Sequence, residues 1–76
     1  MLSDADKEII LTLADNNMNI SSTAKSLFMH RNTVVYHLGK VKKVTGLDPM
    51  NFYDLIKLVS LINPQKLREE ELLCGE

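Results

Sequence analysis

The apolar residues of this chain recur every three or four positions along almost its whole length. That spacing places them on one face of a helix, whereas no run alternates for long enough to predict a strand. The chain has 76 residues, which fits one domain and leaves no room for two. Because so short a chain buries only about 60 % of its unfolded surface, its helices must pack well or pair with another chain. We therefore expect an all-α fold, a small bundle of four or five helices.

Capping residues and chain breakers divide this pattern into segments. We predict helices at residues 4 to about 15, 20–28, 31–45 and 52–63, and a final, weaker helix at 64–73. Ser3 can cap the first helix with Asp6 as its capping-box partner, and Asn51 with Asp54 should do the same for the fourth. Gly46 can adopt the left-handed conformation that ends the third helix.

The apolar face of each segment predicts the core. The residues that we expect to be buried are Ile9, Ile10 and Leu13 in the first helix, Ile20, Ala24, Leu27 and Phe28 in the second, and Val34, Leu38, Val41 and Thr45 in the third. The segment at 52–63 is apolar on more than one side, so it requires more than one neighbour. It is either the central core helix of the bundle or, in addition, a surface that pairs with a second chain.

Charge is distributed unevenly along the chain, although the net charge is only −1 at pH 7. All ten acidic residues lie outside residues 16–47. That middle stretch carries five cations, which are Lys25, Arg31, Lys40, Lys42 and Lys43. A local positive field matters more than the total charge for capturing a polyanion. The pattern indicates either a nucleic-acid partner or a solvated basic face with no partner.

The third helix has a second, polar face. At 100° per residue, the side opposite its buried valines carries Asn32, Tyr36, Gly39, Lys40 and Lys43. Glycine inside a helix costs roughly 1 kcal/mol relative to alanine. Gly39 is therefore either tolerated or kept so that another backbone can approach closely.

The second and third helices, joined by a short turn, follow the plan of a helix-turn-helix. Its second helix enters the major groove of DNA, where its first residues reach the base edges. We predict base contacts from Arg31, Asn32, Thr33 and Tyr36. We predict phosphate contacts from Ser21, Ser22, Thr23, Lys25, Lys40 and Lys43. Each small polar residue in these sets can instead be a helix cap or a solvated position.

The motifs around this turn resemble a known family. They are Asn19-Ile20-Ser21, Thr23-Ala24, Leu27-Phe28, His30-Arg31-Asn32-Thr33, Tyr36, Leu38 and Thr45-Gly46-Leu47-Asp48. The sequence is similar to the C-terminal helix-turn-helix domain of PucR-type bacterial regulators of purine catabolism and sugar diacids. The resemblance covers roughly residues 5–62 and implies a Fis-like fold without a wing. The position after Tyr36, commonly basic in the family, is His37, which we count among the phosphate contacts although histidine could weaken or alter that contact.

The resemblance implies the DNA-binding domain of a transcriptional regulator, here residues 1–63, followed by a helical tail at 64–76 that matches nothing we know. Family members carry a sensory region in a longer chain, and these 76 residues contain none. The chain is either an excised domain or a stand-alone protein. We expect double-stranded DNA as partner, a homodimer through the fourth helix that reads two half-sites about 34–36 Å apart, and no cofactor.

Other functions are less consistent with the sequence. His30 and His37 lie seven residues apart rather than the four of a helical metal pair, and we find neither a glycine-rich phosphate loop nor a nucleophile with its base. We therefore expect neither an enzyme nor a metal site. A protein-interaction module without DNA binding would not explain the acid-free middle. RNA binding would require more exposed aromatic residues than Tyr36 alone.

The sequence also predicts a cytoplasmic protein. Three acids near the start lie where a signal peptide would be apolar, and no apolar run approaches the length of a membrane span. The lone Cys74 cannot form a disulfide within the chain.

Overall fold

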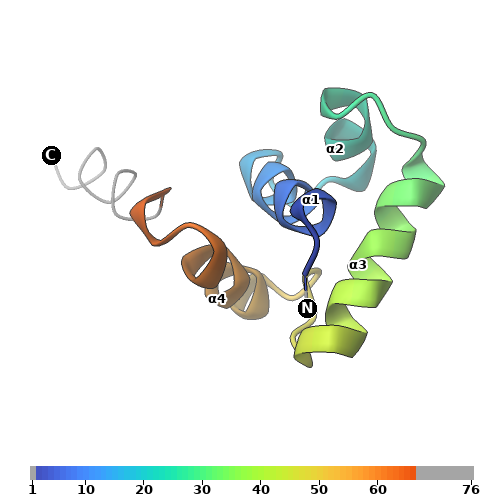
Figure 1. The fold of residues 1–76 in the computed structure, drawn as a ribbon. Helices are drawn as coiled ribbons and strands as arrows, with labels where there is room; N and C mark the ends of the chain where they lie inside the picture. Colours follow the sequence, from blue (N-terminus) through green and yellow to red (C-terminus); the bar gives the residue numbers. More distant parts are fainter. Residues whose placement is uncertain (1, 67–76) are drawn as a thin grey trace, which may run out of the picture.

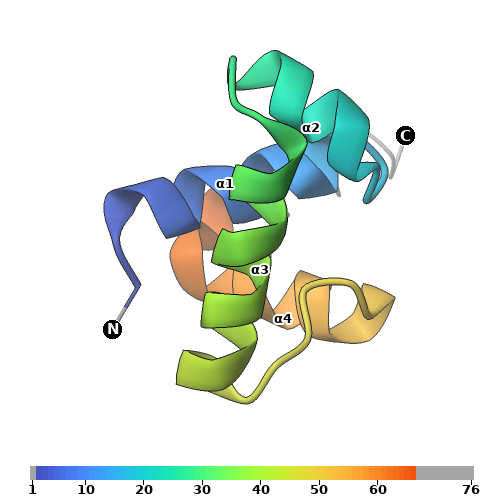
Figure 2. The same ribbon diagram turned by 90° about the vertical axis from the view of Figure 1, so that its right-hand side faces the viewer.

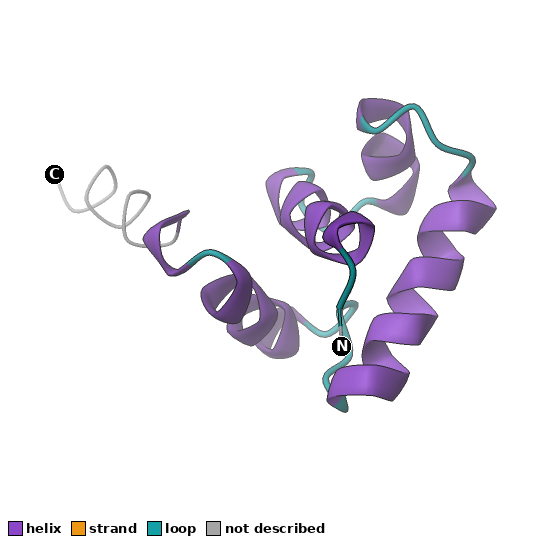
Figure 3. Cartoon of the chain, viewed as in Figure 1, coloured by secondary structure: helices purple, strands orange, loops and turns teal. Residues whose placement is uncertain are grey.

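The computed structural model describes residues 2–66, which fold into four helices (Figures 1 and 3). They are α1 (Asp4–Asp15), α2 (Ile20–Ser26), α3 (Arg31–Thr45) and α4 (Phe52–Ile62), with a further helical turn at 64–66. No strand occurs among the described residues, so the prediction of a small all-α bundle is confirmed. The rest of the helix predicted at 64–73 lies outside them.

Helix α1 occupies the centre of the bundle, and this arrangement leaves α3 at the edge of the molecule. In Figure 1, α4 lies on one side of α1, whereas α2 and α3 lie on the other. Among the described helices, α4 packs against α1 alone, and α3 packs against α1 and α2. The central core helix is therefore α1, and the alternative in which α4 holds that place is wrong.

The helix boundaries follow from local capping, largely as predicted. The N–H of Asp6 donates to Ser3 Oγ at 3.1 Å and the N–H of Ser3 donates to the Asp6 carboxylate at 2.9 Å, which completes the predicted capping box. Gly46, at φ +76°, ends α3. At α4 the box is only half formed, because the Asp54 carboxylate accepts instead from the N–H of Asp48, at 3.0 Å. That bond ties the α3–α4 loop to the first turn of α4.

The core is built from the predicted faces of α1 and α3, whereas of the face predicted in α2 only Ala24 is buried and Ile20 and Leu27 are half-buried. Its buried members are Ile9, Ile10, Leu13, Ala24, Val34, Leu38, Val41, Leu55, Leu58 and Val59. The predicted phase of α3 is therefore confirmed. Thr45, at the end of that face, is only half-buried, and its hydroxyl donates to the carbonyl of Val41 at 2.8 Å.

Helix α2 ends two residues earlier than predicted, and Phe28 is not in the core. Its side chain is 97 % exposed and its backbone is left-handed, at φ +54°. The N–H of Phe28 donates to the carbonyl of Lys25, and the N–H of Met29 donates to that of Ala24. These two bonds form a Schellman motif, which turns the chain out of α2 and carries Phe28 away from the inward face.

Candidate nucleic-acid interface

The outer face of α3 is open along its length. Only the inner face packs on α1 and α2, and Figure 2, turned by 90°, shows α3 as the foremost element of the bundle. The exposed residues of α3 include Arg31, Asn32, Thr33, Tyr36, Gly39 and Lys43. Tyr36 is 69 % exposed, which is far more than a core aromatic would be. A polar surface that runs along α3 is therefore free to contact a partner.

The predicted base-reading residues lie together at one end of this surface. Arg31, Asn32 and Thr33 form the first turn of α3, and Tyr36 follows one turn later. The ring of His30 caps the helix, since its Nδ1 accepts the N–H of Asn32 at 3.0 Å. That cap, which sequence reasoning missed, starts α3 at the Arg31 position and so exposes these side chains in its first turns.

Three of the predicted phosphate contacts at α2 remain available, and one does not. Ser21 and Lys25 are exposed, and Ser22 is half-buried while its N–H donates to Asn19 Oδ1 at 2.8 Å. Thr23 is fully buried, and its hydroxyl donates to the carbonyl of Asn19 at 2.8 Å. The prediction that the Thr23 side chain contacts a phosphate is therefore wrong, because it points into the bundle and its hydroxyl proton is already engaged.

His37 and Lys40 turn toward a carboxylate on α1. His37 Nδ1 lies 2.7 Å from Asp6 Oδ1, and Lys40 Nζ lies 3.1 Å from Asp6 Oδ2. The Asp6 side chain is fully buried, whereas 19 % of the His37 side chain and 38 % of that of Lys40 are exposed. We call these three residues the Asp6 cluster. The phosphate contact predicted for His37 stays a prediction, although Asp6 engages its Nδ1 and only 19 % of its side chain is exposed. The Lys40 ammonium pairs with Asp6 and remains partly exposed.

The Asp6 cluster ties α3 to α1 with a charged acceptor. Burial by itself would raise the pKa of Asp6, but the hydrogen bond from the Ser3 backbone N–H and the contacts with His37 and Lys40 outweigh it. Together they hold the pKa of Asp6 well below its usual range. The carboxylate is therefore ionised at neutral pH, and its contacts with His37 and Lys40 join α3 to α1 from inside the protein.

The other cations near the end of α3 differ in their surroundings. Lys42 is 64 % exposed and lies 3.7 Å from the Asp48 carboxylate, on the flank of the helix. Lys43 is exposed on the outer face and makes no ion pair with any residue from 2 to 66. The Lys43 ammonium is therefore available to a partner, because no carboxylate among these residues pairs with it.

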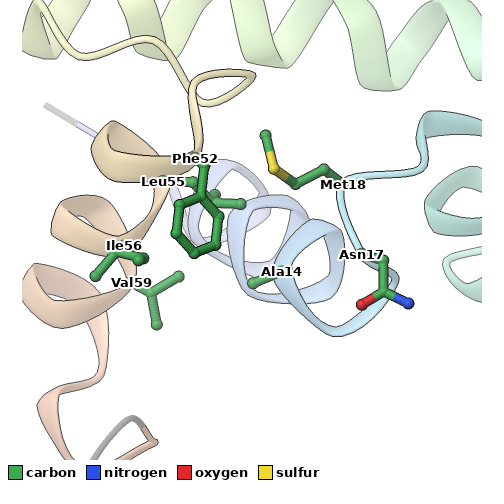
Figure 4. Close-up of a pocket in the computed structure, with 7 residues that line it drawn as sticks. All are labelled: Ala14, Asn17, Met18, Phe52, Leu55, Ile56 and Val59. Atoms are coloured by element: carbon green, nitrogen blue, oxygen red, sulfur yellow. The ribbon is translucent and has the colours of Figure 1, made fainter.

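A second exposed surface lies on α4, across α1 from α3. Phe52, Tyr53 and Leu61 are 58 %, 73 % and 75 % exposed. Beside them a hollow opens between the end of α1 and α4 (Figure 4), lined by Ala14, Asn17, Met18, Phe52, Leu55, Ile56 and Val59. Helix α4 thus buries one side on α1 and leaves apolar side chains uncovered on the other.

Neither metal ligation nor membrane insertion is supported by the described part of the chain. Residues 2–66 contain no group of three histidine, cysteine, aspartate or glutamate side chains placed to hold a metal ion. None of the helices within that range combines the length and apolar character needed to cross a bilayer.

Comparison with known proteins gives two matches. Residues 7–61 match the family model of the PucR C-terminal helix-turn-helix domain. Over 43 residues, 57 % of this chain, the sequence is 44 % identical to the carbohydrate diacid regulator of Escherichia coli (strain K12). The matched segment spans only 11 % of that regulator's length. No solved structure matches the chain.

Proposed function

Because the chain belongs to the family of PucR C-terminal helix-turn-helix domains, we propose that it binds double-stranded DNA sequence-specifically, with α3 in the major groove. The family consists of regulator domains rather than enzymes. The observation that carries the proposal is the uncovered outer face of α3, which presents Asn32, Tyr36 and Lys43 together. The major groove, about 12 Å wide, admits one helix.

Base selection is assigned to the first two turns of α3. Arginine pairs bidentately with guanine and asparagine with adenine, so Arg31 and Asn32 match base edges. The methyl group of Thr33 can contact that of thymine. All three side chains are exposed, and Tyr36 extends the same surface by one turn. These four residues would decide which duplex is preferred.

Phosphate contacts are assigned to residues on both sides of the base-reading turns. Lys43 and the exposed part of Lys40 lie further along α3, while Ser21, Ser22 and Lys25 belong to α2. Such contacts set the position and depth of α3 without reading sequence. They would also make the affinity fall steeply with salt, because each neutralised phosphate releases counterions.

Pairing of two copies through α4 is part of the same proposal. Helix α4, which lies across α1 from α3 (Figure 1), carries the exposed apolar side chains of Phe52, Tyr53 and Leu61. A second copy seated there would cover them and leave both α3 helices free. Two linked domains would read two half-sites about one DNA turn apart, which offsets the modest affinity of one small module.

The domain would act as the DNA-reading part of a bacterial transcriptional regulator in the cytoplasm. The matched relative is named for carbohydrate diacids, but only 11 % of its length corresponds to this chain. We therefore assign DNA binding to this chain and leave effector sensing to other parts of such regulators.

Selection from random duplexes, followed by anisotropy titration at two salt concentrations, tests the proposal. We expect one enriched site with two symmetric halves, bound about 10³-fold or more tightly than random DNA. We also expect the affinity to fall with salt according to several released counterions. A chain that enriches no site while it self-associates through α4 would instead favour an interaction module without DNA binding.

A further inference from the structure

Gly39 lies in the middle of the outer face of α3, and nothing among residues 2–66 requires a glycine there. A β-carbon built on Gly39 meets no atom within 4 Å, so no neighbouring side chain or helix needs the space. Its φ is not positive, unlike that of Gly46. Glycine weakens a helix interior relative to alanine, because its unfolded backbone has more freedom to lose. The packing of the described residues therefore gives no reason for a glycine at this position.

The surface around Gly39 is a shallow hollow with a mixed lining. Its residues are Val35, Tyr36, Gly39, Lys40 and Lys43. Two lysines stand beside an aliphatic and an aromatic side chain, and the ammonium of Lys40 also lies 3.1 Å from the buried Asp6 carboxylate. A sugar–phosphate unit matches this lining, because its phosphate suits the two lysines and its deoxyribose ring suits the aliphatic side chain of Val35.

The position of Gly39 along α3 agrees with such an occupant. It lies eight residues after Arg31, which corresponds to about 12 Å along the helix axis. The major groove is also about 12 Å wide. A straight helix whose first turn reaches the base edges therefore meets the rim of the groove near its middle turns. At that rim the helix faces a phosphate strand rather than bases.

We propose that the hollow at Gly39 seats one sugar–phosphate unit of a DNA strand, and that the missing side chain lets this strand approach the backbone of α3. Lys40 and Lys43 bind the phosphate, while Val35 contacts the sugar. The inference rests on the proposed function and adds to it a positioning residue that sets how deeply α3 enters the groove.

The experiment measures stability and affinity of the same variants of the full 76-residue chain. Gly39→Ala should raise Tm by about 4–8 °C, because alanine is the better helix former. It should also weaken binding by about fivefold or more, because its methyl group occupies the seat. Gly39→Leu should weaken binding further while the fold persists. The probes are labelled duplexes, one selected by the wild-type chain and one of random sequence.

The matched control is Thr12→Ala, a substitution to alanine at a half-buried position of α1, outside both α3 and α4. It should leave affinity unchanged. That result would show that higher helix stability does not by itself weaken binding. If Gly39→Ala lowers the affinity for both duplexes equally, the result supports binding of a sugar–phosphate unit at this hollow. Wild-type affinity in both Gly39 variants, or a loss confined to the selected duplex, overturns it. A wild-type chain that binds neither duplex overturns the proposed function itself.

Discussion

Replacing Asp6 by asparagine should loosen α3 from α1 without changing the shape of the side chain. The substitution removes the charge that His37 Nδ1 meets at 2.7 Å and Lys40 Nζ at 3.1 Å. Asparagine can still accept the N–H of Ser3, so the capping box is kept in part. The loss therefore falls mainly on the two contacts between α1 and α3.

The size of the effect follows from the exposure of each partner. A hydrogen bond to a charged group contributes about 1.5–3 kcal/mol, a range that suits the largely buried His37 contact. Lys40 is 38 % exposed and regains water, so its contact contributes at most about 1 kcal/mol. Together these give a loss of about 2–4 kcal/mol in the free energy of unfolding at pH 7. For a domain of this size, Tm should fall by about 10 °C or more.

The assay is urea unfolding of wild type and Asp6→Asn at pH 7, 5 and 3, with Asp4→Asn as control. Asp4 lies in the same first turn and is exposed. Because folding lowers the pKa of Asp6, its contribution is complete above the unfolded pKa of about 3.9 and is lost as pH falls toward the folded value. The difference between wild type and Asp6→Asn should therefore shrink from pH 5 to pH 3. Equal stability of Asp6→Asn and Asp4→Asn at pH 7, or a difference unaffected by acid, would refute the reasoning.

Three further substitutions test the interface and the helix phase. Asn32→Ala should cost roughly 1–3 kcal/mol at the selected duplex and lower its discrimination from random DNA in anisotropy titrations; unaltered discrimination would remove Asn32 from base reading. Lys43→Ala should reduce the salt slope by about one phosphate contact, whereas Lys42→Ala, which removes the same charge beside Asp48, should change it little; equal slopes in both would contradict the assignment. Val34→Asp should abolish cooperative unfolding in circular dichroism melts because it buries an unpaired charge, whereas Val35→Asp, at a position 43 % exposed, should still melt cooperatively.

Signals confined to a few consecutive residues predicted most of the fold. The Ser3–Asp6 capping box and Gly46 set helix ends by local hydrogen bonding and backbone preference, and the structure has them as expected. The apolar phase of α3 followed from the 3.6-residue period, so its buried and open faces could also be assigned. These features depend on neighbours within one or two turns, which a sequence displays directly.

Features that depend on contacts between helices could not be predicted. Asp6 was expected only as a capping residue, but it also binds His37, 31 residues away, across the α1–α3 contact. Thr23 was placed outward for its hydroxyl, but α2 is short and buries it against the bundle. Phe28 was placed inward by spacing, but the Schellman turn rotates it into solvent.

In the candidate site, too, some features could be predicted from the sequence and others could not. The open face with Asn32, Tyr36 and Lys43 was predicted from helix periodicity, because its exposure depends only on the phase of α3. The positions of His37 and Lys40 needed the fold, since the Asp6 carboxylate that holds them comes from another helix. Which bases or phosphates each side chain meets is a property of the complex.

Nuclear Overhauser effects between the isotope-labelled chain and its unlabelled selected duplex test the central claim most directly. If the outer face of α3 lies in the major groove, the Tyr36 ring and the Asn32 side-chain amide should show effects to major-groove base protons. Strong binding in which these protons show no effects, while those of α4 contact the duplex, would contradict the account.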